Sequence, residues 1–209
     1  MTASTPLVFF HSPNTRSTGV LLLLEELGAP YELRLLNMKQ GENRQPEYLA
    51  INPLGKVPAI LHGDALVTEQ VALYIYLADL FPAAALAPAF NDTLRGPYLR
   101  WLAYYGSCFE PAIVDRYQKH APAPVGMSPY GDFDSMFGTL CAQLQRGPYM
   151  LGARFQALDV LWSTALDWMS RFALIPEVAA IKDYVARVNA RPAMVRGREK
   201  DAALAAGQS

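Results

Sequence analysis

A short run near residue 55 places two prolines and a glycine directly before an apolar segment, and it reads Asn52-Pro53-Leu54-Gly55-Lys56-Val57-Pro58-Ala59-Ile60. Pro58 has no amide hydrogen to donate to a β-ladder, so the run predicts a tight loop that leads into a strand. A cis Val57–Pro58 bond would suit such a turn, because the trans preference of an X-Pro bond is only about 0.5–1 kcal/mol. The amide and carbonyl of Val57 would then point outward, where they can pair with an extended peptide. An ordinary junction between a loop and a strand is the alternative.

The segments around this loop predict a small α/β domain. Apolar patterns place strands at residues 7–10, 31–38, 57–61 and 65–67, and helices at residues 20–27 and 69–80. Gly28 stands where a helix C-cap belongs, and the Gly63-Asp64 pair indicates a hairpin turn. The first two strands are expected to be parallel, so the order is βαβ and then ββα. This order is similar to that of a thioredoxin-like domain.

The second half of the chain has a different pattern. A stretch rich in proline and alanine at residues 81–88 predicts a linker, and the later signals are helical. Helices are expected at about residues 92–119, 130–145, 157–172, 177–190 and 192–204. The predicted domains are therefore a thioredoxin-like domain at residues 1–82, a linker at 83–91 and an all-helical domain at 92–209.

The composition is that of a folded protein without a strongly charged partner. Of 209 residues, 52% are hydrophobic and 18% are charged, which argues against disorder. The net charge is −1 and no basic stripe is visible, so nucleic acid is not expected as a partner. The N-terminus does not resemble a secretory signal, and the apolar run at residues 71–78 is too short to span a bilayer. A cytoplasmic location and no membrane partner are expected.

Cysteine and histidine usage predicts neither a disulfide nor a metal site. Cys108 and Cys141 lie in helical surroundings without a close His or Cys partner, which is typical of free thiols. The histidines, His11, His62 and His120, are scattered along the chain. No metal is expected.

Four motifs occur in the order and spacing of a known family. They are the Ser12-Pro13-Asn14-Thr15-Arg16 turn, the loop at residues 52–58, an acid at Glu69 that begins a helix, and the Phe155-Gln156-Ala157-Leu158-Asp159 segment. With these motifs the chain resembles the glutathione S-transferase family, of the bacterial cytosolic type. The resemblance implies the two-domain fold above, glutathione as co-substrate, a role in detoxification and a homodimer.

The resemblance also implies a side chain that donates a hydrogen bond to the glutathione thiolate. Ser12 is favoured, because serine-type members place a Ser a few residues before an Arg, here Arg16. Thr15 and Asn14 are the alternatives by alignment with cysteine-type bacterial members and some fungal relatives. A free thiol titrates near pH ~8.5, and a donor together with a helix N-terminus can lower this by about one or two units. Ser12 or Thr15 could instead be only a helix N-cap.

Glutathione-binding positions follow from the same resemblance. Val57 and Pro58 would present the backbone, Glu69 would pair with the γ-glutamyl ammonium group, and Gln70 stands where the family usually has Ser. Lys56 could meet the glycyl carboxylate, although a lone Lys is more often simply solvated. Glu69 could also serve only to complement the dipole of its own helix, worth about 0.3–1 kcal/mol.

The helical domain would supply the site for the second substrate. Tyr104, Tyr105, Phe109 and Trp162 are the candidate lining for an apolar electrophile, although aromatics at helical spacing are more often core. Arg100 and Arg116 could receive an anionic substrate group.

The function predicted from the sequence is a glutathione transferase that attaches the sulfur to a small hydrophobic electrophile. A glutathione-dependent isomerase or dehalogenase, and a non-catalytic glutathione-binding or regulatory scaffold, are the alternatives. Cys108 is the first cysteine, so the 12–15 turn lacks the thiol that disulfide exchange needs. Disulfide reduction by that route is not expected.

Overall fold

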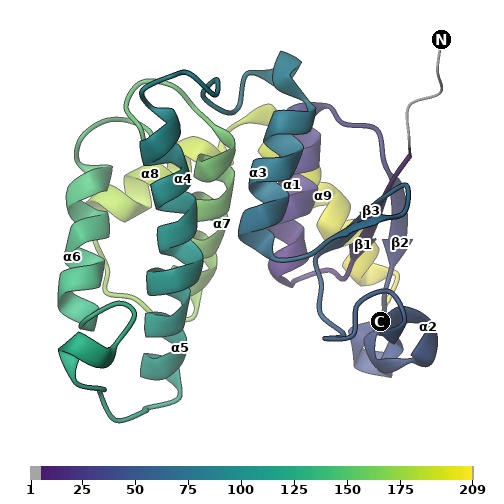
Figure 1. Ribbon diagram of the computed structural model, residues 1–209, viewed down its shortest axis with the longest axis horizontal. Helices are drawn as coiled ribbons and strands as arrows, with labels where there is room; N and C mark the ends of the chain where they lie inside the picture. The colour runs from purple at the N-terminus through teal and green to yellow at the C-terminus, as the bar shows by residue number, and fades with distance from the viewer. Residues whose placement is uncertain (1–5, 209) are drawn as a thin grey trace. The chain divides into compact units, whose positions relative to one another are not determined.

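The computed structural model describes residues 6–208 and divides them into two units (Figure 1). The first unit comprises residues 6–84 together with 191–208, and the second comprises residues 85–190. The fold class predicted from the sequence is confirmed, because an α/β unit with a four-stranded mixed sheet is joined to a unit built of helices.

The sheet of the first unit has the strand order β2-β1-β3-β4. Its strands are β1 (Leu7–His11), β2 (Glu32–Leu35), β3 (Ala59–His62) and β4 (Ala65–Val67). β1 and β2 are parallel, whereas β3 is antiparallel to both β1 and β4, as the predicted βαβ unit and hairpin require.

Helices cover both faces of this sheet. They are α1 (Arg16–Leu27), α2 (Pro46–Leu49), α3 (Gln70–Leu80) and α9 (Pro192–Ala206). Phe10 packs with Tyr48 of α2 on one face. Side chains alternate along a strand, so Phe9, which is fully buried, points to the opposite face.

α1 is the central helix of the first unit. Residues 20–24 are at most 1% exposed because α3 and α9 both pack against this helix. The helix ends at Gly28, which adopts the left-handed conformation (φ 61°) as its predicted C-cap role requires.

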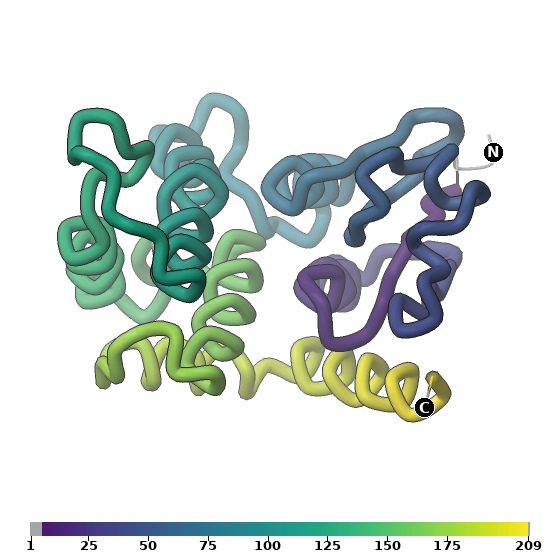
Figure 2. Tube along the Cα trace, turned by 90° about the horizontal axis from the view of Figure 1, so that it is seen from below, coloured from purple at the N-terminus to yellow at the C-terminus, as the bar shows by residue number. Residues whose placement is uncertain are grey.

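α9 lies along α1, as Figure 2 shows from below. At Gly197 a Cβ atom would lie 2.6 Å from Cδ2 of Leu22, so the glycine permits this close approach. Arg191 also binds the Glu26 carboxylate through two nitrogens, at 2.7 and 2.8 Å. The domain boundaries expected from the sequence stay predictions. In the structure, residues 191–208 pack with the first unit.

The second unit contains α4 (Arg95–Tyr104), α5 (Glu110–Tyr117), α6 (Phe133–Leu144), α7 (Ala157–Arg171) and α8 (Ala179–Asn189). A π-helical turn at Tyr105–Phe109 joins α4 to α5, so the one long helix predicted here contains a wider turn near its middle. Asp159, which is fully buried, accepts hydrogen bonds at 2.8 Å from the backbone N–H groups of Met150 and Gln156 and from the Tyr184 hydroxyl.

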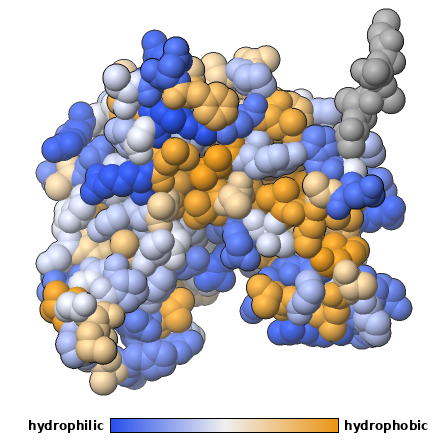
Figure 3. All heavy atoms as spheres, in the orientation of Figure 1, coloured by the Kyte–Doolittle hydropathy of each residue, from blue (hydrophilic) through white to orange (hydrophobic). Residues whose placement is uncertain are grey.

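Apolar side chains gather on the surface at the end of this unit where α5 and α6 are joined (Figure 3). They include Val125, 63% exposed, and Met127, 81% exposed.

Among the helices of residues 6–208, none combines the length and the hydropathy that crossing a membrane needs.

Candidate functional site

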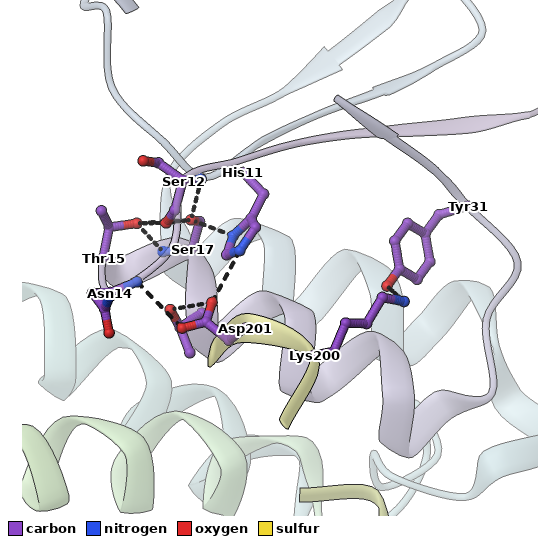
Figure 4. A network of polar contacts seen from close by, with 9 residues as sticks. His11, Ser12, Asn14, Thr15, Ser17, Tyr31, Lys200 and Asp201 are labelled. Atoms are coloured by element: carbon purple, nitrogen blue, oxygen red, sulfur yellow. Dashed lines mark hydrogen bonds and ion pairs between the residues drawn. The ribbon is translucent and has the colours of Figure 1, made fainter. Parts of the chain in front are cut away.

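The turn between β1 and α1 is held by a buried hydroxyl at its centre (Figure 4). The Oγ atom of Ser17, a fully buried residue in the first turn of α1, accepts a hydrogen bond from the backbone N–H of Ser12 at 3.1 Å. It also lies 3.0 Å from the Ser12 carbonyl oxygen and 2.7 Å from Oγ1 of Thr15. Ser17 therefore holds the backbone N–H of Ser12 and lies close to its carbonyl.

Thr15 is the N-cap of α1. Its Oγ1 accepts the Ser17 N–H at 3.2 Å, and its hydroxyl donates to the Ser12 carbonyl at 2.7 Å. One hydroxyl carries one proton, so Thr15 commits its proton inside the turn. Its candidate role as thiol donor stays a prediction.

The Ser12 side chain differs from that of Thr15. Figure 4 shows it pointing away from Ser17, with no hydrogen bond at its oxygen. Within residues 6–208, the Ser12 hydroxyl has no hydrogen-bond partner, although the residue is only 4% exposed. Asn14 is exposed and adopts φ 56°, a left-handed conformation that Asn tolerates better than most residues. Ser12 is thus the hydroxyl of this turn that is free to bind a ligand.

Asp201 of α9 fastens this turn from the far end of the chain. Its Oδ2 accepts the backbone N–H of Asn14 at 3.2 Å, and its Oδ1 accepts the Thr18 hydroxyl at 2.9 Å. Oδ1 also lies 3.0 Å from Nε2 of His11, the last residue of β1. Burial raises the pKa of Asp201, but these hydrogen bonds outweigh burial and leave the pKa below its ordinary value.

The loop at residues 52–58 is held by side chains close to it in sequence. The Lys56 carbonyl accepts hydrogen bonds from the Tyr48 hydroxyl at 2.6 Å and from the Asn52 amide at 2.8 Å. The Asn43 amide donates to the Gly55 carbonyl at 2.8 Å. The Val57–Pro58 bond is cis, as the sequence allowed.

Val57 and Pro58 differ in what they offer a ligand. In the described part of the chain, the backbone N–H and C=O of Val57 make no hydrogen bond, whereas Pro58 is buried at the start of β3. The side chain of Lys56 is exposed. This loop therefore presents one unpaired peptide group and one cation.

The start of α3 carries the two remaining candidates of this unit. Glu69 precedes the helix with φ 62° and ψ 117°, and its side chain makes no capping hydrogen bond. Holding a non-glycine residue at such angles costs of order 1–3 kcal/mol, and residues of this kind cluster at functional sites. The Gln70 amide donates to the Arg16 carbonyl at 3.3 Å, which ties the start of α3 to the start of α1.

The sheet register brings the turn and the loop to the same edge. Phe10 of β1 lies opposite Ala59 of β3, and continuing this antiparallel register sets Ser12 opposite Val57. Together with the bond from Gln70 to Arg16, this gathers a free hydroxyl, an unpaired peptide group and two helix N-termini at one end of the unit. Helix N-termini attract negative charge, so the arrangement suits an anionic peptide.

Sequence comparison identifies the family of the chain. The model of the "Glutathione S-transferase, N-terminal domain" matches residues 5–79. The glutathione S-transferase-like protein gedE of Aspergillus terreus is 30% identical over 159 residues, which cover 68% of this chain and 70% of the relative. The chain belongs to the glutathione S-transferase family. The resemblance inferred from the four motifs is confirmed.

Two further relatives in this family are named for different activities. Glutathione S-transferase GstA of Escherichia coli O157:H7 is 27% identical over 161 residues, covering 76% of this chain and 80% of the relative. The disulfide-bond oxidoreductase YfcG of Escherichia coli strain K12 is 24% identical over 198 residues, covering 88% and 90%. Family membership thus makes this a glutathione-related enzyme, and leaves the reaction to be argued from its own residues.

Solved structures share the whole glutathione S-transferase fold. A glutathione transferase from Methylococcus capsulatus is 25% identical with a TM-score of 0.78, over 94% of this chain and 99% of that one. A sphingomonad glutathione S-transferase complexed with glutathione is 27% identical with a TM-score of 0.74, over 93% and 98%.

The candidate electrophile-site residues lie in an aromatic cluster of the second unit. Trp162 is fully buried and contacts the rings of Tyr104, Tyr105 and Phe109 at centroid distances of 6.5, 5.6 and 5.1 Å. Tyr105 and Phe109 are 3% and 0% exposed, whereas Tyr104 is partly exposed. Burial favours a core role for Tyr105, Phe109 and Trp162, and the electrophile assignment stays a prediction.

Sequence reasoning missed three residues of the polar network, namely His11, Ser17 and Asp201. Ser17 lies in the first turn of a helix, where a hydroxyl is unremarkable, and His11 was considered only as a metal ligand. Asp201 sits in a helix with no local signal, 187 residues from the backbone N–H that it accepts. Local spacing could not have found it.

Proposed function

We propose that this protein binds glutathione in its first unit, stabilises the thiolate at the turn of residues 12–15, and transfers the sulfur to a small apolar electrophile. One observation carries the proposal. The Ser12 hydroxyl has no hydrogen-bond partner within residues 6–208, and it stands at the N-terminus of α1 with its own backbone fixed. A hydroxyl in that place donates to an anion without first breaking another bond.

The other candidates suit the remaining parts of the tripeptide. The unpaired N–H and C=O of Val57 would pair with the cysteinyl backbone of glutathione in the manner of an added strand. Glu69 would take the ammonium group of the γ-glutamyl residue, and the amides at the start of α3 would take its carboxylate. Lys56 would meet the glycyl carboxylate.

The chemistry follows from charge. The thiol proton leaves to solvent, and the Ser12 O–H donates to the thiolate while the end of α1 supplies partial positive charge. Lowering the pKa of a thiol by one unit corresponds to about 1.4 kcal/mol of preference for the thiolate. The sulfur then attacks an electrophilic carbon, a new C–S bond forms, and the electron pair passes to a leaving group or to a conjugated acceptor.

The proposal is tested by titrating the ultraviolet absorbance of the glutathione thiolate with pH, with and without saturating protein. A midpoint well below that of free glutathione supports activation at this turn. Unshifted titration of glutathione that is demonstrably bound would instead favour the scaffold alternative. Absence of binding would remove the proposal altogether.

The product then separates transferase from its enzymatic alternatives. Mass spectrometry after incubation with an aryl halide or an enone should detect a lasting thioether if the protein is a transferase. An isomerase or dehalogenase would return free glutathione. Because the 12–15 turn carries no cysteine, we expect no reduction of a glutathione mixed disulfide through it.

A further inference from the structure

The network behind Ser12 continues to a buried histidine and a carboxylate. Nδ1 of His11 lies 2.7 Å from Oγ of Ser17, and Nε2 on the other side of the ring lies 3.0 Å from Oδ1 of Asp201. His11 and Ser17 are both fully buried. A carboxylate, an imidazole and a hydroxyl therefore stand in line behind the backbone of Ser12 (Figure 4).

The order of protons along this line follows from its chemistry. The Asp201 carboxylate only accepts, so the tautomer that suits it places a proton on Nε2 of His11, and in that tautomer Nδ1 is the acceptor. The Ser17 hydroxyl can then donate to Nδ1 and keep a lone pair for the Ser12 N–H, while the Thr15 hydroxyl donates to the Ser12 carbonyl. Without that acceptor, the Ser17 proton would be directed to the Ser12 carbonyl, where it competes with Thr15.

We propose that Asp201, His11 and Ser17 are positioning residues that fix the Ser12 backbone and so aim its hydroxyl at the thiol. This inference rests on the proposed function, and none of the three residues touches glutathione. Ser12 donates its N–H to Ser17 and accepts the Thr15 hydroxyl at its carbonyl, so its side chain has a fixed origin. A donor fixed before the ligand arrives needs no reorganisation when charge develops on the sulfur.

Asp201 adds a second point of attachment. Through Oδ2 it holds the N–H of Asn14, so the turn is fastened on both sides of Pro13. The carboxylate comes from α9 while every group that it binds comes from β1, α1 or the turn between them. The position of the thiol donor therefore depends on how α9 is seated on α1.

The decisive variant is Ser17→Ala, because it removes one hydroxyl and leaves the Asp201–His11 pair intact. The measurements are the pH midpoint of bound glutathione thiolate and the steady-state constants with a fixed electrophile. We expect the midpoint to rise by about one unit and kcat to fall about tenfold, with KM for glutathione changed less than about twofold. Ser17→Thr, which keeps the hydroxyl, should recover most of the loss.

Ser163→Ala is the matched control. Ser163 is also fully buried in a helix, and its hydroxyl bonds only the Val160 carbonyl at 3.3 Å in the second unit. A purely structural effect would lower the stability of both variants and leave the thiolate midpoint of both unchanged. An unchanged midpoint in folded Ser17→Ala overturns the proposal.

Asp201→Asn tests the carboxylate end of the Asp201–His11–Ser17 network, and it remains decisive if Ser17→Ala does not fold. An Asn side chain cannot replace both contacts of the carboxylate, because it has one oxygen and one NH₂ group. If the NH₂ group faces the Asn14 N–H, two donors oppose each other; otherwise the NH₂ group faces Nε2 of His11. The second orientation moves the His11 proton to Nδ1, which 15N shifts of the imidazole ring report. We expect the thiolate midpoint to rise, whereas loss of a negative charge alone would lower it. A lowered midpoint contradicts the proposal.

The two hypotheses fail in different ways. If wild-type protein leaves the glutathione thiol unshifted, the proposed function fails and the positioning role falls with it. If wild-type protein shifts the thiol and both variants shift it equally, the proposed function stands and the positioning role alone is wrong.

Discussion

The two loops of the candidate site are held in opposite ways. The loop at residues 52–58 is fixed by Asn43, Tyr48 and Asn52, which lie 12, 8 and 4 residues from the carbonyl groups they bind. The turn at residues 12–15 takes a decisive contact from Asp201, 187 residues away. One loop is a local motif, and the other is completed by tertiary packing. The difference predicts which changes each loop should tolerate.

Ser12→Ala should have the largest effect, because it removes the proposed donor from the turn without touching the loop. We expect kcat to fall about 10²-fold, as for removal of one donor that stabilises a developing anion, with little change in KM for glutathione. Thr15→Ala should lower kcat less, since its hydroxyl is already used within the turn. Equal kcat in wild type and in variants of Ser12, Asn14 and Thr15 would show that the turn is not the thiol site.

Asn52→Ala should damage the loop and spare the turn. Asn52 is 4% exposed and donates to the Lys56 carbonyl, while its Oδ1 accepts the Leu54 N–H at 3.2 Å. Leaving such groups unpaired should lower the free energy of unfolding by about 1–3 kcal/mol. Affinity for glutathione should fall with it, and urea unfolding and isothermal calorimetry measure the two effects.

Asn91→Ala is the control for this variant, since Asn91 is an exposed residue of the second unit. Its unfolding free energy should change by less than about 0.5 kcal/mol. If Asn52→Ala weakens glutathione binding no more than Asn91→Ala does, the loop does not present Val57 to the ligand.

Gly197→Ala should damage the turn through α9. The added methyl group would lie 2.6 Å from Cδ2 of Leu22, which is itself fully buried, so the Leu22 side chain must move or the two helices must separate. We expect the free energy of unfolding to fall by about 1 kcal/mol or more. Gly138→Ala in α6, where the added Cβ would meet no described atom within 4 Å apart from its chain neighbours and the backbone of its own helix, should instead raise it by about 0.5–1 kcal/mol. Thermal unfolding of both variants shows whether the free energy of unfolding falls or rises in each.

The smallest expected effect is a pH dependence of stability that comes from the charge of Asp201. Its pKa in the folded protein lies below the ordinary value of 3.8, so its contribution to stability is present above that pH. The contribution is lost as pH falls through the folded pKa. Between pH 5 and about pH 3, wild type should lose more unfolding free energy than Asp201→Asn, measured by urea titration at each pH. Parallel curves would contradict this.

Most of the fold was predictable from the sequence, because its signals are local. Gly28 as a left-handed cap, the hairpin of residues 59–67 and the cis bond before Pro58 each follow from residues within a few positions. The π-helical turn at residues 105–109 was not predicted, although Pro111 follows it and removes the regular hydrogen bond to the Ser107 carbonyl within the turn.

The candidate site was predictable only in part. The family motifs, by their spacing, place Ser12, Val57 and Glu69 in the candidate site, and their roles there stay predictions. His11, Ser17 and Asp201 carry no such spacing, because a contact between the start and the end of a chain depends on how helices pack. The same limit applies to Tyr105 and Phe109, whose helical spacing is equally suited to a core and to a binding surface.

The seating of α9 on α1 has a consequence for synthesis on the ribosome. When the first 84 residues have emerged, all four strands are present, together with α1 and α3, whose first residues lie close to the turn at residues 12–15. Asp201 is not yet present. The nascent chain must extend through the whole second unit before the carboxylate that fastens Asn14 and His11 exists. A ribosome-bound fragment of the first 84 residues would carry three of the four family motifs and still lack the carboxylate that fastens the turn at residues 12–15.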